Sequence, residues 1–259
     1  MTPVVRLVLA VTVGAFFLQQ VLPGFGNALV FVPAFVLVRP WTVLTYMLLH
    51  AGLGHLFFNM LALFFFGPRV EARLGSNRFL ALYLISGATG ALLSLALALG
   101  GVGSPAPIVG ASGGVFGVSL AFAYYWPDEQ ILIWGIVPVP ARILVVVTAL
   151  ISLWSGFGGR GGNVAHFAHL GGYLGAFLYL KWTERGRARF RTQATTAPKE
   201  AVRPVADYRR IDRGSLHELN REEVDRILDK ISAKGVGSLT EQERLFLSNF
   251  VPMDDRKPT

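Results

Sequence analysis

Residues His50–Val70, HAGLGHLFFNMLALFFFGPRV, hold two histidines and an asparagine within a stretch that is otherwise largely apolar. A membrane-spanning helix needs about 20 predominantly apolar residues, and this stretch has that length. Further apolar segments of similar length lie on both sides of it, which predicts an all-α polytopic membrane protein with a bundle of six transmembrane helices. The predicted spans are Val4–Leu22, Ala51–Val70, Phe79–Leu99, Ile108–Trp126, Pro140–Trp154 and Val164–Leu180.

Charged residues are distributed unevenly along the chain: residues 1–180 hold 10 and residues 181–259 hold 30. This contrast implies lipid around the first part and water around the second, and it excludes a single soluble domain or disorder throughout. The net charge of +8 suggests nucleic acid, but acids and bases are interleaved in the tail, so we predict no nucleic-acid partner. Cysteine is absent, which excludes disulfides and thiolate sites.

Two connecting segments are too apolar or too interrupted to be simple linkers. Pro23–His50 is rich in Phe and Val with three prolines, and we expect it to lie in the membrane interface. Before the fifth span, Ile131–Val137 is expected to be an interfacial hairpin arm, with the helix beginning near Pro140. The first span is interpreted as retained rather than as a signal peptide, because no small-residue cleavage site follows it.

The basic residues of the short loops indicate the orientation. One side holds most of them: Arg6, Arg69, Arg73, Arg78, Arg142, Lys181, Arg185, Arg187, Arg189 and Arg191. The other side has only Arg39 and Arg160. Both termini of this multi-pass protein are therefore predicted to be cytoplasmic, and its compact six-span layout favours the inner membrane of a bacterium.

Ionisable and amide side chains inside spans are candidates for function. Four of the five histidines lie in or at the ends of the second and sixth spans: His50, His55, His166 and His169. Asn59 follows His55 by four residues, so the two share one helix face and could donate hydrogen bonds to one point. Helix capping, helix–helix hydrogen bonding by Asn59, and quinone or metal ligation are the alternatives.

The fourth span opens with Gly110-Ala111-Ser112-Gly113-Gly114-Val115-Phe116-Gly117. Serine between glycines is common in tightly packed membrane helices, so the motif alone favours packing. Pro105 and Pro107 precede it, however, which predicts Ser112 in the first helical turn beside free backbone N–H groups.

Glycines spaced four apart predict where two of the spans approach each other. Gly113 and Gly117 form such a pair in the fourth span, and Gly171 and Gly175 form another in the sixth. Close approach of these two helices would bring the Ser112 hydroxyl within reach of a histidine nitrogen.

Three motifs together resemble the rhomboid family of intramembrane serine proteases. They are His50-x-x-x-x-His55-x-x-x-Asn59, Gly110-Ala111-Ser112-Gly113 and Ala168-His169-Leu170-Gly171-Gly172, in the family's order. Glu71-x-Arg73-x-Gly75-Ser76 also looks like the family's turn after the second span, and the resemblance covers roughly residues 4–183. Some members carry a Trp-Arg pair in the first loop, whereas this chain has Arg39-Pro40-Trp41.

The resemblance implies a Ser–His dyad without cofactor or metal. Ser112 would be the nucleophile and His169 the general base and acid, with no carboxylate to complete a triad. The oxyanion would be bound by the Ser112 N–H, His55 and Asn59. Supporting residues would be His50, Gly110, Gly113 and Phe116, and His166 has no role in the family motif.

Substrates, by the same resemblance, would be single-span membrane proteins cut in or near the outer leaflet. Two other functions stay open. A rhomboid-like pseudoprotease would bind membrane proteins without cutting them, and a small transporter would use the histidines as a proton relay.

The tail is predicted to consist of a basic linker, residues 184–215, and a two-helix unit, residues 216–259. Asn220-x-x-Glu223 and Thr240-x-x-Glu243 are capping-box patterns, and Gly235 is expected to end the first helix. The sequence does not indicate the partner of this tail.

Overall fold

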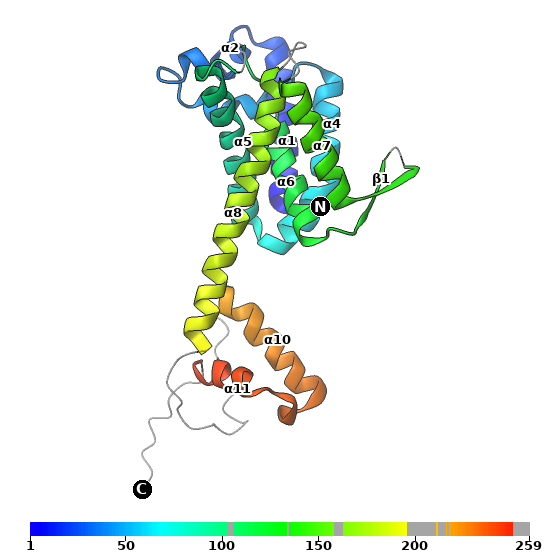
Figure 1. The fold of residues 1–259 in the computed structure, drawn as a ribbon, viewed down its shortest axis with the longest axis vertical. Coiled ribbons are helices and arrows are strands. Elements are labelled where there is room, and N and C mark those ends of the chain that lie inside the picture. Colours follow the sequence, from blue (N-terminus) through cyan, green and yellow to red (C-terminus); the bar gives the residue numbers. More distant parts are fainter. Residues whose placement is uncertain are drawn as a thin grey trace. The chain divides into compact units, whose positions relative to one another are not determined.

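The computed structural model describes residues 1–102, 106–133, 135–157, 163–195, 211, 216 and 218–250. The chain forms two compact units, Met1–Lys181 and Trp182–Thr259. Figure 1 shows the elements of both.

Helices occupy all six predicted spans, which confirms the fold class of an all-α polytopic membrane bundle. They are α1 (Pro3–Val21), α4 (Leu53–Leu74), α5 (Ser76–Leu99), α6 (Ser112–Tyr125), α7 (Ala141–Phe157) and α8 (Asn163–Thr195). Within the described residues, α1, α4 and α5 are long and apolar enough to cross a bilayer on their own, and α7 is a shorter apolar helix.

Two helix ends differ from the prediction. Helix α6 begins at Ser112 and not near Ile108, because Ile108 exchanges backbone hydrogen bonds with Phe31 (2.8 and 3.3 Å) in an isolated β-bridge. Helix α8 continues to Thr195, through the first part of the predicted linker, since no proline interrupts it before Pro198. Most of the remaining linker, residues 196–210, lies outside the described residues.

The segment between α1 and α4 folds into short helical turns, α2 (Phe25–Leu29), η1 (Pro33–Phe35), α3 (Thr42–Thr45) and η2 (Tyr46–Leu48). Arg39 donates from its guanidinium to the carbonyl of Asn27, and Trp41 donates from its indole N–H to that of Ala28, both at 3.0 Å. Two side chains of the Arg-Pro-Trp sequence therefore hold its backbone against α2, within the same segment. Its place in the membrane interface stays a prediction.

A hairpin of two short strands precedes α7. Strands β1 (Gln130–Ile133) and β2 (Val137–Pro140) pair antiparallel, with Gln130 opposite Pro140, and α7 begins directly after β2. The predicted hairpin and the helix start near Pro140 are confirmed, and the place of the hairpin in the membrane interface stays a prediction.

Glu71 lies near the C-terminus of α4 and connects it to the N-terminus of α1. Glu71 is 2% exposed. Its carboxylate accepts hydrogen bonds from the backbone N–H groups of Val4 (3.0 Å) and Val5 (2.9 Å) and from the hydroxyl of Ser76 (2.7 Å). The first N–H groups of an α-helix lack acceptors within the helix, so this carboxylate caps α1 from another helix. Gly75 makes the turn into α5 with φ 82°, which a side chain would strain.

Glu71→Gln is expected to destabilise the bundle by about 2 kcal/mol, since a carboxamide turns an NH₂ group toward donors that need an acceptor. Thermal unfolding of the detergent-solubilised protein measures this. Glu129→Gln is the matched control, because Glu129 pairs with Arg69 on the surface with 44% of its side chain exposed. Equal unfolding midpoints in the two variants would contradict the capping role.

The second unit contains α10 (Glu218–Lys234), η3 (Val236–Ser238) and α11 (Glu241–Ser248). Helix α10 begins at Glu218, so Asn220 lies inside its first turn and its predicted role as N-cap is wrong. The capping box of Thr240 and Glu243 is confirmed, as is Gly235 with φ 74° after the end of α10. Apolar side chains join the helices: Ile211, Val224, Ile227, Leu239, Phe246 and Leu247.

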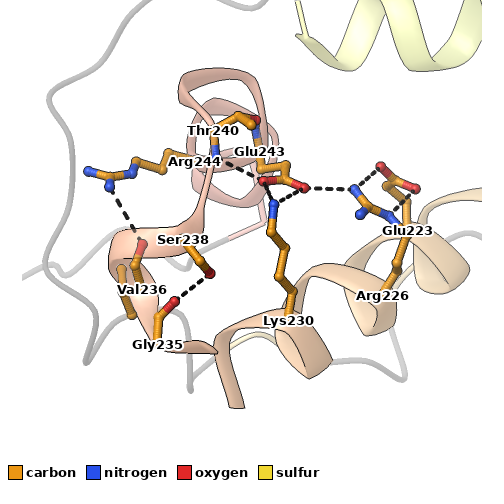
Figure 2. Close-up of polar contacts among 9 residues, drawn as sticks. All are labelled: Glu223, Arg226, Lys230, Gly235, Val236, Ser238, Thr240, Glu243 and Arg244. Atoms are coloured by element: carbon orange, nitrogen blue, oxygen red, sulfur yellow. Dashed lines mark hydrogen bonds and ion pairs between the residues drawn. The ribbon is translucent and has the colours of Figure 1, made fainter. Parts of the chain in front are cut away.

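Glu243 links α11 to α10, as Figure 2 shows. Its carboxylate accepts from the Lys230 ammonium at 2.8 and 3.1 Å, from the Arg226 guanidinium at 3.0 Å and from the Thr240 N–H at 2.8 Å. The hydrogen bond from Lys230, followed by that from the Thr240 backbone, lowers the pKa of Glu243 from 4.5 to about 2.

The α10–α11 contact should therefore weaken as the pH falls. A carboxylate with a depressed pKa stabilises the fold fully above its ordinary pKa, and that contribution is lost between about pH 5 and pH 2. Glu243→Gln should remove it at neutral pH and lower hydrogen-exchange protection of α11 about fivefold. Glu241→Gln, at an exposed position of the same helix, is the control; equal protection in both variants would contradict the link.

Candidate active site

Ser112 is the first residue of α6, and the backbone before it has a conformation that only glycine adopts readily. Gly110 has φ 127°, and a Cβ on it would lie 2.6 Å from Cε1 and 2.9 Å from Nε2 of His55. The imidazole of His55 thus lies against the chain just before the serine. A side chain at residue 110 would displace it.

His169 of α8 lies within hydrogen-bond distance of Ser112. Its Nε2 is 2.9 Å from the serine Oγ, although the two residues are 57 positions apart in the chain. This is the geometry of a nucleophile beside a general base. The structure thus brings the two predicted residues together, and their catalytic roles remain predictions.

A glycine contact between α8 and α6 permits this distance. A Cβ on Gly172 would collide with the carbonyl oxygen of Gly113, so the two backbones touch. The predicted close approach is confirmed, but the predicted glycine pairing is wrong. Gly171 and Gly175 lie against Thr89 of α5, and Gly117 lies mainly against the Ser86 side chain.

The imidazole of His169 is stacked on Phe116, one turn after the serine. The ring centroids are 4.1 Å apart and the planes differ by 13°. Since an aromatic ring on one face limits rotation of the imidazole, Phe116 keeps Nε2 directed at the serine. The resemblance implied a ring at this position, and the supporting role of Phe116 in catalysis stays a prediction.

Backbone donors surround Ser112. The first N–H groups of a helix have no acceptor within it, which leaves those of Ser112 and Gly113 directed out of the N-terminus of α6. The first intrahelical bond is that from Val115 N to Ala111 O, at 3.0 Å. The position beside Ser112 is therefore suited to a developing negative charge.

His55 and Asn59 of α4 add side-chain donors. Nδ1 of His55 accepts from the backbone N–H of Ala51 (3.4 Å), which places the proton on Nε2, the nitrogen that faces Gly110. Asn59 donates one amide hydrogen to the carbonyl of His55 (2.8 Å) and keeps the second for another acceptor. Within the described part of the chain, each of the two side chains thus keeps one hydrogen-bond donor without an acceptor.

His50 supports the chain before Ser112 and is fully buried. Its Nε2 accepts from the Ala111 N–H (3.5 Å), and its ring lies 5.0 Å from that of His55. The side chain of Gln19 bonds both backbone groups of His50, at 3.0 and 3.1 Å. Gln19 was not among the predicted site residues, although a glutamine in an apolar span was the available signal.

The carboxylates of residues 1–180 form hydrogen bonds and ion pairs with residues other than Ser112 and His169. Residues 1–180 contain three acids: Glu71 caps α1, Asp128 pairs with Arg142 (3.0 Å), and Glu129 pairs with Arg69 (3.0 Å). All three acids of this part of the chain thus bind other groups, and catalysis by a Ser–His dyad without a carboxylate stays a prediction. His166 lies 5.9 Å from His169, ring to ring, and no cluster of three metal-ligating His, Cys, Asp or Glu side chains occurs in the described part of the chain.

Known protein families match two parts of the chain. The Rhomboid domain family matches residues 38–184, and a family of unknown function matches residues 217–250 in the tail. The chain is 38% identical over 138 residues to the rhomboid protease GluP of Bacillus subtilis, which is 53% of this chain and 25% of GluP. It is 38% identical over 133 residues to the mitochondrial Rhomboid protein 1 of Saccharomyces cerevisiae, 50% of this chain and 38% of that protein.

A third relative is covered over more of its length. The putative rhomboid protease YdcA of Bacillus subtilis is 32% identical over 150 residues, 56% of this chain and 70% of YdcA. The chain thus spans well under half the length of the first two relatives and most of the third.

Proposed function

Since the chain belongs to the rhomboid family and is a multi-pass membrane protein, we propose that it is an intramembrane serine endopeptidase that cleaves single-span membrane proteins. The observation that carries this proposal is the 2.9 Å contact between Ser112 Oγ and His169 Nε2 at the N-terminus of α6. Residues 1–183 form the protease domain in this proposal, and the tail is a separate appendage.

The proposed reaction is acyl transfer through the dyad. His169 Nε2 takes the proton from Ser112 as its Oγ attacks the scissile carbonyl carbon, and the imidazolium then protonates the leaving amine. Water attacks the resulting ester, with His169 again as the base, and Ser112 regains its proton. The stack on Phe116 holds the imidazole through both steps.

The oxyanion of each tetrahedral intermediate is assigned to three donors: the Ser112 N–H, His55 Nε2–H and the free amide hydrogen of Asn59. They come from a helix N-terminus and from the neighbouring α4, so they are in place before substrate binds. Donors that need no rearrangement stabilise the transition state most effectively.

The length of α6 supports a site below the membrane surface. Its 14 residues span about 21 Å at ~1.5 Å per residue, against a hydrocarbon core of about 30 Å. At the C-terminal end of α6, the Lys181 Nζ lies 5.3 Å from the centre of the Tyr124 ring, and the Arg73 Cζ lies 5.3 Å from the centre of the Tyr125 ring. Aromatic and basic side chains together are typical of the membrane interface. Ser112 then lies roughly 9 Å inside the opposite interface.

With both termini cytoplasmic in a bacterial inner membrane, that opposite leaflet is the outer one. The substrate helix must unwind there, because helical carbonyls are otherwise engaged in hydrogen bonds. We expect helix-breaking residues near the cleavage point and a small residue just before it.

A fluorophosphonate probe tests the proposal directly, because it reacts only with an activated serine. Wild-type protein in liposomes should be labelled and Ser112→Ala should not. Ser119→Ala is the matched control, since Ser119 lies two turns further along α6 and its hydroxyl donates to the Val115 carbonyl at 2.9 Å. Labelling that persists in Ser112→Ala, or is absent from the wild type, would reject the proposal.

A further inference from the structure

A hydrogen bond between α7 and α8 lies next to Phe116, the ring that is stacked on His169. The Tyr173 hydroxyl is 2.7 Å from Thr148 Oγ1, and the Tyr173 ring is 5.2 Å from that of Phe116. Tyr173 follows His169 by four residues and shares its helix face, so Phe116 contacts both rings. Neither Tyr173 nor Thr148 belongs to the motifs that carry the family resemblance.

The direction of this hydrogen bond follows from the other contacts of Thr148. Its Oγ1 donates within α7 to the carbonyl of Leu144 (2.7 Å) or of Val145 (3.1 Å), which uses its single proton. The Tyr173 hydroxyl is therefore the donor to Thr148. The result is a continuous chain of bonds from the Tyr173 ring to the backbone of α7.

We propose that Tyr173 and Thr148 are positioning residues that hold Phe116 against His169 and thereby keep the imidazole directed at Ser112. Tyr173 is 9% exposed, and its hydroxyl fixes the ring in one orientation. With the Tyr173 ring fixed, Phe116 packs against a ring that keeps one position, 5.2 Å away from centroid to centroid. Without the hydroxyl bond, both aromatic rings gain freedom and the imidazole loses its alignment. This inference rests on the proposed function.

Four variants test it in full-length protein in liposomes. Tyr173→Phe and Thr148→Val each remove one hydroxyl and keep the shape, and their combination removes the same bond again. Thr148→Ser keeps the hydroxyl. Ser119→Ala is the matched control, because the Ser119 hydroxyl donates to a carbonyl of its own helix, that of Val115 (2.9 Å).

We expect Tyr173→Phe and Thr148→Val each to lower kcat for a single-span substrate about tenfold with KM unchanged. The rate of fluorophosphonate labelling should fall in parallel, since it depends on Ser112 activation and not on substrate binding. The double variant should equal either single variant, because both remove one interaction. Thr148→Ser and Ser119→Ala should keep the wild-type rates, and unfolding midpoints identify any variant that fails to fold.

The following results would overturn this inference and leave the proposed function intact: wild-type kcat and labelling in Tyr173→Phe and Thr148→Val, or losses that multiply in the double variant. A wild-type protein that neither cleaves nor labels would instead overturn the proposed function, and the positioning role with it. Effects confined to KM would also contradict a role in aligning His169.

Discussion

Ser112→Ala and His169→Ala are each expected to reduce cleavage of a single-span substrate in liposomes by at least ~10³-fold. Alanine at 112 removes the atom that attacks the carbonyl. Alanine at 169 leaves that hydroxyl without a base, at 2.9 Å from where the imidazole nitrogen was. The measurement is the initial rate of product formation with purified protein and substrate in the same vesicles.

The double variant distinguishes a dyad from two independent contributions. Residues that act as one unit give non-additive losses, so Ser112→Ala with His169→Ala should cleave no more slowly than either single variant. Ser119→Ala should cleave at the wild-type rate. Cleavage that survives Ser112→Ala would eliminate the dyad, and a wild type that binds the substrate without cutting it would favour a pseudoprotease.

The predicted helices were accessible from the sequence because a lipid environment imposes one strong requirement, a long apolar run. Where helices start was less accessible. Ile108 is as apolar as a helical residue, yet it pairs with Phe31, which lies 77 positions earlier. Such a bridge depends on how the segment after α1 folds back, and hydropathy carries no information about that.

The candidate site divides in the same way. The side chains that would do chemistry stand out as costly polar groups in apolar helices, so His55, Asn59 and His169 could be found from the sequence. The residues that position these side chains could not be found in this way. Gln19 acts on His50 from another helix, and Tyr173 is bonded to α7, so each needs the tertiary structure to be recognised.

The glycine pattern illustrates the limit most clearly. Spacing identified small-residue stripes correctly but assigned the wrong partners, because a helix in a bundle has several neighbours and spacing does not determine which of them a stripe faces. Gly171 and Gly175 face α5, while Gly172, one position away, faces Gly113 of α6. A shift of one residue rotates the contact by about 100°, and periodicity does not determine that angle.

Gly172→Ala is accordingly expected to lower the cleavage rate by about 10²-fold. The new Cβ would collide with the carbonyl oxygen of Gly113 and lie 2.8 Å from its carbon and 3.0 Å from its Cα. These are backbone atoms at the start of α6 and cannot move aside as a side chain can. The helices must separate, and the contact between Ser112 and His169 then exceeds hydrogen-bond distance.

Gly14→Ala provides the control for Gly172→Ala, because Gly14 lies in α1 and a Cβ there meets nothing within 4 Å. Rates are compared below the unfolding midpoint of both variants, so that loss of activity reports on the site and not on unfolding. A folded Gly172→Ala protein that cleaves like wild type would mean that α8 can move away from α6 without separating the dyad. Labelling by the fluorophosphonate should fall with cleavage, since separation of His169 from Ser112 removes the base whichever acyl donor is offered.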